Sequence, residues 1–167
     1  MADLLFISGS FGLGHVFRDL AIANEIRRLR PDTRVSWMAG DPARQVIAGA
    51  GETLLSEAAL YASDSDPAEA IAQNMHANLV QYAIRARRAW LQNVRLFHQV
   101  LSRQHFDAVV GDETYELAIA MLLNRHLCHR PFTMIYDFMG FEPRDGRFME
   151  RLGVWLLNRV WTMDWHL

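Results

Sequence analysis

The sequence contains no lysine, because all 17 of its basic residues are arginine. This absence excludes a P-loop lysine, a Schiff-base lysine and a lysine nucleophile from the segment. Cys128 is the one cysteine, so an internal disulfide, a cysteine-rich zinc site and a CxxC redox pair are excluded as well. The net charge of −2 gives no overall positive field, and we therefore expect no nucleic-acid partner.

Long hydrophobic runs are also missing. No run of roughly 18 uncharged apolar residues occurs, which predicts that no segment spans a membrane. The apolar run at residues 4–7 is short and follows no positively charged segment, so we interpret it as a strand rather than a signal peptide. We expect a cytoplasmic protein, and peripheral attachment to the inner face of a membrane is left open.

The chain alternates between segments with the periodicity of strands and segments with the periodicity of helices. Strands are predicted at residues 4–7, 33–39, 53–56, 106–111 and 131–136, and helices at 15–30, 42–50, 66–104, 117–123 and 148–161. This alternation predicts the α/β class with a mostly parallel sheet, because right-handed crossovers return successive strands side by side. The length suits one domain over residues 1–167.

Two local expectations concern helix faces and caps. The helix over 15–30 is expected to face the sheet with its apolar residues Leu20, Ala23, Ile26 and Leu29. Asp41 is expected to be the N-cap of the next helix, with Pro42 at the first helical position. A contact between Asp41 and a ribose hydroxyl is the less favoured alternative.

A glycine-rich loop follows the first predicted strand. Gly9, Gly12 and Gly14 let backbone approach a ligand there, and the first turn of the next helix offers unpaired N–H groups. The spacing is G-x-x-G-x-G and not the dinucleotide fingerprint G-x-G-x-x-G, so a dehydrogenase is disfavoured. His15 lies at the mouth of this loop and is a candidate general base. The alternative is an ordinary helix-capping turn with an exposed histidine.

Carboxylates follow two later strands of the predicted sheet. Asp112 and Glu113 come directly after the strand at 106–111, and Asp137 follows the strand at 131–136. We expect these strand ends to converge on one crevice with the loop that carries His15. A carboxylate beside His15 would keep one imidazole nitrogen protonated, which leaves the other to take a proton from a hydroxyl. Asp112 could instead cap the helix that begins near Tyr115.

These residues resemble a known family. Residues 9–15, the helix segment 20–23, the helix end 48–51 and the segment 106–112 are similar to the amino-terminal domain of GT-B glycosyltransferases. Within that group the similarity is to the lipid-acceptor branch, family 28, which includes the enzyme that forms peptidoglycan lipid II and the galactolipid synthases. The similarity extends over nearly the whole chain in the order of its elements.

The resemblance implies a Rossmann-like three-layer α/β/α domain that forms the acceptor-binding half of an inverting transferase. It implies a UDP-sugar as donor, a lipid-linked or hydrophobic acceptor, no metal and no cofactor. His15 would deprotonate the acceptor hydroxyl, and Asp112 would orient His15. The substrate-binding positions would be Phe11, Gly12, Leu13, Gly14, Glu113, Tyr115 and Asp137.

Three positions of the loop depart from the family pattern. Phe11 and Leu13 replace small residues of the lipid II enzyme, and Arg18 replaces a proline. These changes leave the chemical identity of the acceptor undetermined. We expect the donor-binding domain to be absent from this chain and supplied by further sequence or by a partner subunit, so that the isolated chain is inactive.

Two other functions remain as alternatives. One is a scaffold subunit that recruits a catalytic partner to a membrane, suggested by a mixture of apolar and basic residues suited to an interface: Phe11, Leu13, Trp155, Trp161, Trp165, Arg147, Arg151 and Arg159. The other is half of a nucleotide-sugar epimerase, which would need no acceptor.

Overall fold

The computed structural model describes residues 1–9, 12–63, 79–137, 140, 142–143 and 147–161. Its strands are β1 (Ala2–Ser8), β2 (Thr33–Ala39), β3 (Thr53–Leu54), β4 (Ala108–Asp112) and β5 (Phe132–Ile135). Its helices are α1 (Leu13–Leu29), α2 (Ala43–Gly49), α4 (Leu79–Arg103), α5 (Tyr115–Leu123) and α6 (Phe148–Trp161), with 3-10 turns η1 (Ser56–Leu60) and η2 (Arg125–Leu127).

The five strands form one parallel sheet in the order β3-β2-β1-β4-β5. β1 is central, with Phe6 opposite Trp37 of β2 on one side and Val110 of β4 on the other. The chain moves outward from β1 to β3 and then returns to β4, so the direction of winding reverses between β1 and β4. Open α/β sheets bind ligands outside the carboxyl ends of the strands at such a reversal. The predicted α/β class and mostly parallel sheet are confirmed.

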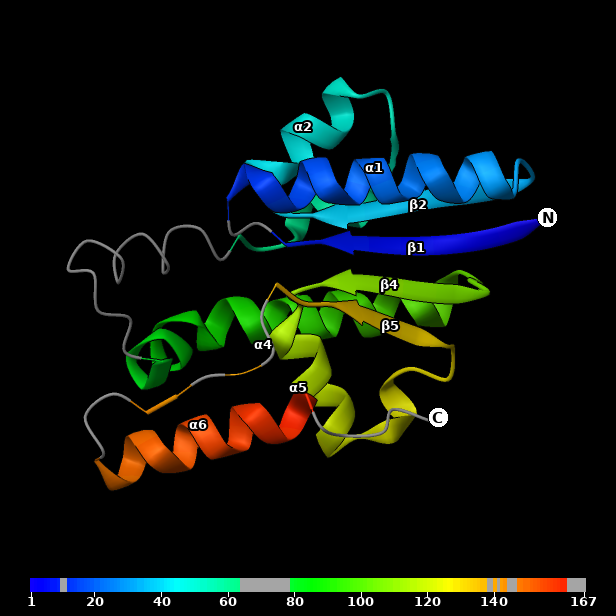
Figure 1. The fold of residues 1–167 in the computed structure, drawn as a ribbon. Coiled ribbons are helices and arrows are strands. Elements are labelled where there is room, and N and C mark those ends of the chain that lie inside the picture. The colour runs from blue at the N-terminus through cyan, green and yellow to red at the C-terminus, as the bar shows by residue number, and fades with distance from the viewer. Residues whose placement is uncertain (10–11, 64–78, 138–139, 141, 144–146, 162–167) are drawn as a thin grey trace.

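Helices cover both faces of the sheet, as Figure 1 shows for α1 on one side and α4 on the other. Alternate residues of β1 point to opposite faces. Leu5 and Ile7 pack with Phe97 of α4, whereas Phe6 packs with Val16 of α1 and stacks on Trp37 at 4.6 Å between ring centroids. Burial on both faces explains why the strands are almost continuously apolar. The predicted three-layer arrangement is therefore present.

Two local predictions need correction. Ala23 is buried and Leu20 packs against the core as predicted. Leu29, however, is 62% exposed, because α1 turns its polar residues His15 and Asp19 toward the sheet. Asp41 does not cap α2, which begins at Ala43 and has no side-chain cap. The Asp41 carboxylate instead pairs with Arg44 at 2.8 Å, and this ion pair occupies the oxygens that a cap would need.

The predicted helix over 66–104 is present from Leu79, and its residues 66–78 lie outside the described residues. The predicted helix over 148–161 has the expected bounds. In the described part of the chain, no helix is both long enough and apolar enough to cross a bilayer.

Candidate functional site at the carboxyl edge of the sheet

The loop after β1 lies against the end of β4. A Cβ atom added to Gly9 would be 2.8 Å from the carbonyl oxygen of Asp112, so glycine permits this close approach. Gly12, with φ of 85°, takes the N-cap position of α1. The helix begins at Leu13, two residues before the predicted start, and places His15 in its first turn.

His15 is surrounded by three carboxylates from two strand ends. Its side chain is about nine-tenths buried, and Nδ1 lies 3.2 Å from Oδ2 of the fully buried Asp112. Nε2 faces Glu113 Oε2 at 3.7 Å and Asp137 Oδ2 at 3.5 Å. The expected convergence of these residues is thus present, and His15 is not the exposed histidine of a simple capping turn.

Arg18 completes the cluster from the next turn of α1. Its Nη2 donates to both oxygens of Asp112, at 2.6 and 2.8 Å, and also lies 3.0 Å from His15 Nδ1. Its Nη1 pairs with Asp137 Oδ1. One guanidinium therefore joins the ends of β4 and β5, and it competes with His15 Nδ1 for Asp112.

Asp19 is a further acidic group of the site, fully buried on α1. Ser8 Oγ donates to Asp19 Oδ2 at 2.5 Å. Burial, and next the charge of Asp112, raise the pKa of Asp19 to about 8. Asp19 is therefore largely protonated and uncharged at neutral pH, which lets two carboxyl groups share this interior.

At Glu113 the backbone turns sharply after the end of β4, with φ of 49°. Its Oε1 accepts a hydrogen bond from the Asp137 N–H at 3.4 Å, and Oε2 is left facing His15. Burial raises the pKa of Glu113, although the positive charge that His15 carries when protonated acts in the opposite direction.

The remaining predicted residues lie around this cluster. Leu13 is 44% exposed, and no atom lies within 4 Å of the position of an added Cβ on Gly12 or Gly14 among the described residues. Tyr115 packs on Tyr136 at 6.3 Å between ring centroids, and burial raises its pKa. Phe11 lies outside the described residues.

Asp112 does not cap α5. Thr114 occupies that N-cap position and forms no side-chain cap there. The Asp112 carboxylate is instead directed to Arg18 and His15, which rules out the alternative of a capping aspartate.

Sequence reasoning missed Arg18 as a bridge and missed Asp19 and Ser8. The available signal was the i, i+4, i+8 spacing of His15, Asp19 and Ala23, which all lie buried on one face of α1. The prediction from apolar residues alone rotated the sheet-facing side of α1 toward Leu29, because polar residues were not considered as buried.

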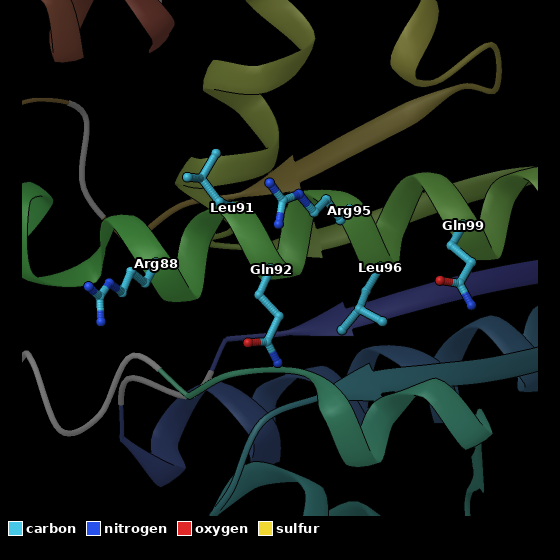
Figure 2. A pocket seen from close by; sticks show the side chains of 6 residues that line it. All are labelled: Arg88, Leu91, Gln92, Arg95, Leu96 and Gln99. Atoms are coloured by element: carbon cyan, nitrogen blue, oxygen red, sulfur yellow. The ribbon is translucent and has the colours of Figure 1, made fainter.

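Two grooves lie elsewhere on the molecule. One, of about 360 Å³, runs along α4, where Gln92 and Leu96 extend toward η1 (Figure 2). Gln92 also donates to the Leu60 carbonyl at 2.5 Å. The other, of about 490 Å³, lies beside Asp3, Thr33 and His105, near the amino ends of β1 and β2 and the turn before β4. Both are formed by residues other than the His15 cluster.

No family model and no curated protein matches the sequence. Solved structures do match in fold. CalG4, the calicheamicin glycosyltransferase, has a TM-score of 0.53 and 18% identity, over 91% of this chain and 36% of its own. MurG of Acinetobacter baumannii has a TM-score of 0.49 and 15% identity, over 80% of this chain and 35% of its own. The chain spans about a third of the length of these proteins, and it has the Rossmann-like fold of part of a GT-B glycosyltransferase.

Proposed function

We propose that this chain is the acceptor-binding half of a nucleotide-sugar-dependent glycosyltransferase. The observation that carries the proposal is the contact between His15 Nδ1 and Asp112 Oδ2, 3.2 Å long, at the edge where the sheet reverses its winding. This pair has the arrangement of a general base and the carboxylate that orients it. The fold shared with part of CalG4 is consistent with the proposal.

In the proposed reaction, His15 Nδ1–H donates to Asp112 and Nε2 takes the proton of an acceptor hydroxyl. The hydroxyl oxygen attacks the anomeric carbon of a UDP-sugar as the bond to the diphosphate breaks, and the configuration at that carbon inverts. The positive charge that develops on the imidazole is stabilised by Asp112, Glu113 and Asp137. No metal or cofactor takes part in this proposed step.

The surroundings of His15 support a hydrophobic or lipid-linked acceptor. Leu13 and Phe17 on α1 are 44% and 60% exposed, which presents apolar surface beside the glycine loop. The open space at Gly12 and Gly14 would let acceptor or donor phosphate approach backbone N–H groups. Glu113, Tyr115 and Asp137 would form the rest of the acceptor site.

The UDP-sugar and its leaving diphosphate are assigned to a second domain or a partner subunit. The chain corresponds to 36% of the CalG4 chain, so most of a protein of that length lies outside the matched part. We expect the isolated chain to show little or no turnover with UDP-sugars and lipid acceptors. Robust transfer by the isolated chain would contradict this division of labour.

The test is glycosyl transfer by the full-length protein or reconstituted complex, over a panel of UDP-sugars and acceptors. His15→Ala should lower kcat by about 10² to 10⁴ with the fold intact, because the base is lost. The control is His98→Ala, an exposed histidine on α4, which should leave kcat unchanged. Unchanged turnover in His15→Ala would reject the base, and conversion of a free nucleotide-sugar without acceptor would favour an epimerase.

A second candidate function is membrane recruitment through α6. This helix exposes Phe148, Trp155 and Leu156 at 77%, 59% and 52%, beside the exposed Arg147 and Arg151. Apolar side chains flanked by arginine suit the interface of an anionic bilayer. We expect Trp155→Ala with Leu156→Ala to weaken flotation on anionic liposomes, and absence of flotation in the parent chain would reject the role.

A further inference from the structure

The face of His15 that points away from Asp112 carries a set of possible metal ligands, beyond the roles that the proposed reaction gives to Glu113 and Asp137. Nε2 of His15, a carboxylate oxygen of Glu113 and a carboxylate oxygen of Asp137 all lie within 4.8 Å of one another. We propose that these three side chains bind a divalent metal ion, Zn²⁺ in preference to Mn²⁺ and Mg²⁺, and that the bound ion blocks His15 from acting as a base.

The distances from His15 Nε2 to the two carboxylate oxygens are close to those between the ligands of one metal ion. Zinc binds imidazole nitrogen and carboxylate oxygen at about 2.0–2.2 Å, so its ligands lie roughly 3–3.6 Å apart. His15 Nε2 is 3.5 Å from Asp137 Oδ2 and 3.7 Å from Glu113 Oε2. Small side-chain rotations would bring all three onto one ion.

Each ligand is also fixed through its other polar atom. Asp112 Oδ2 holds His15 Nδ1, and Arg18 pairs with Asp137 Oδ1. The Asp137 N–H binds Glu113 Oε1. A carboxylate on the far nitrogen of a metal-binding histidine sets its tautomer and makes it a better ligand, and this arrangement is typical of built metal sites.

The charge of the cluster favours a divalent cation. Three carboxylates, those of Asp112, Glu113 and Asp137, face the single guanidinium of Arg18, which leaves a surplus of two negative charges. Asp19 adds no charge while it is protonated. A divalent ion on neutral His15 would therefore bring the group to neutrality in a largely buried position, where uncompensated charge is costly.

The ligand set selects among metals. One imidazole and two carboxylates with an open position suit Zn²⁺, which commonly takes three protein ligands and one water. Asp137 is 41% exposed, so water can reach that open position. The general order of affinities places Mn²⁺ below Zn²⁺, and Mg²⁺ binds imidazole reluctantly.

The consequence for activity rests on the proposed function. The Nε2 lone pair of His15 cannot bind a metal ion and accept a proton from a hydroxyl at the same time. Zinc is therefore expected to inhibit transfer, and a chelator is expected to restore it. The binding itself does not depend on any activity and is measured separately.

The experiment titrates ZnCl₂ into the chelator-treated chain by calorimetry and records the visible spectrum with Co²⁺. Glu113→Gln and Asp137→Asn should each weaken zinc binding at least about 10-fold, because each replaces a carboxylate ligand with an uncharged amide of similar shape. Asp41→Asn, at a partly exposed carboxylate paired with Arg44, is the matched control and should change nothing. Circular dichroism confirms that each variant is folded.

A second group of histidines must be separated from this site. His126 and His129 lie 5.5 Å apart between ring centroids and could bind zinc on their own. A variant with both changed to glutamine should keep the calorimetric site and its Co²⁺ spectrum. The proposal is overturned if that variant loses the binding, or if Glu113→Gln and Asp137→Asn bind zinc as the parent does.

The two proposals fail in distinguishable ways. Absence of zinc binding, together with loss of turnover in His15→Ala, would reject the metal site and leave the base in place. Zinc binding that His15→Ala weakens, without inhibition of transfer, would reject the assignment of His15 as the base and leave the metal site in place.

Discussion

The buried carboxyl of Asp19 is held without a cationic partner of its own. Arg18, its neighbour in the chain, directs its guanidinium to Asp112 and Asp137, while Asp19 accepts a hydrogen bond from the hydroxyl of Ser8. An acid in this position is easier to bury protonated than ionised. Asp19, which titrates near neutral pH, is therefore a buried group and not part of the surface of the site.

Asp19→Asn should make the stability of the protein less dependent on pH. The pKa of Asp19 is about 8 in the folded chain and roughly 3.9 when unfolded, so the folded state binds more protons between these values. The free energy of unfolding of the parent should therefore fall as pH rises from 5 to 8, by at least about 1 kcal/mol relative to Asp19→Asn. Urea unfolding at several pH values measures it.

Asp41→Asn is the control for this comparison. The side-chain hydrogen bond from Arg44 lowers the pKa of Asp41, so this group stays ionised throughout pH 5 to 8. If the free energy of unfolding of the parent varied with pH in the same way as that of Asp19→Asn, a raised pKa for Asp19 would be contradicted.

At the residue scale, the meeting of His15 with Asp112 and Asp137 was predictable because all three follow strands of one parallel sheet. Strand order along the chain was enough to place them at one edge. Arg18 and Asp19 were not predictable in the same way, because their roles depend on the rotation of α1 about its axis. That rotation is set by packing of the whole helix and not by any local motif.

At the scale of elements, the junction from β4 to α5 depends on close packing around Gly111. A Cβ added there would overlap Thr114 Oγ1 and lie 2.9 Å from the ring of Phe132. Gly111 also pairs with Ile7 in the register of β1 and β4. This contact brings Asp112 to the loop that carries His15.

Gly111→Ala should destabilise the protein by about 1–3 kcal/mol, because the added methyl group overpacks a filled position. The matched control is Gly49→Ala at the end of α2, where an added Cβ meets nothing within 4 Å. That substitution should be neutral or stabilising by about 0.5–1 kcal/mol. Thermal unfolding of both variants gives the comparison, and equal effects would contradict the packing argument.

A buried polar network ties α4 to α5 and to the segment after η1. Asn93 is fully buried, and its side chain bonds the backbone of Ala62 and, at 3.2 Å, Glu116. Tyr61 donates to the same oxygen of Glu116 at 2.9 Å. Removing the Asn93 side chain would take away the hydrogen-bond partner of the Ala62 N–H and of the Ala62 carbonyl, and one donor to Glu116.

Asn93→Ala should therefore lower the free energy of unfolding by about 2–3 kcal/mol. Arg95→Ala, on the exposed side of the same helix, should change it by no more than about 0.5 kcal/mol. Denaturant unfolding of the two variants distinguishes the network from a general effect of substitution on α4. Similar losses in both variants would contradict the role assigned to Asn93.

Most element bounds were predictable because the strands are apolar on both sides and the helices between them are amphipathic. The strand at 33–39 and the helix at 148–161 agree with the structure in both bounds. The cap of α2 was not predictable, since the Asp41 carboxylate pairs with Arg44 instead of the helix N–H groups. Side-chain competition of this kind leaves no trace in the hydrophobic pattern.

At the scale of the whole molecule, the winding of the sheet decides where chemistry can occur. β1 and β4 are adjacent although about a hundred residues separate them in the chain, and their carboxyl ends place His15 against Asp112. The two grooves described above are formed by other residues. The proposed transferase needs only one such edge, with the sugar donor brought by a second domain.

The measurement that tests this account most directly is a double-mutant cycle on His15 and Asp112, read as kcat for transfer in the full-length protein or complex. Asp112 acts through His15, so His15→Ala and the double variant His15→Ala with Asp112→Asn should have the same kcat within about threefold. Asp112→Asn alone should lose at least about 10-fold. Independent losses that multiply in the double variant, or full activity in either single variant, would contradict a base and its orienting carboxylate.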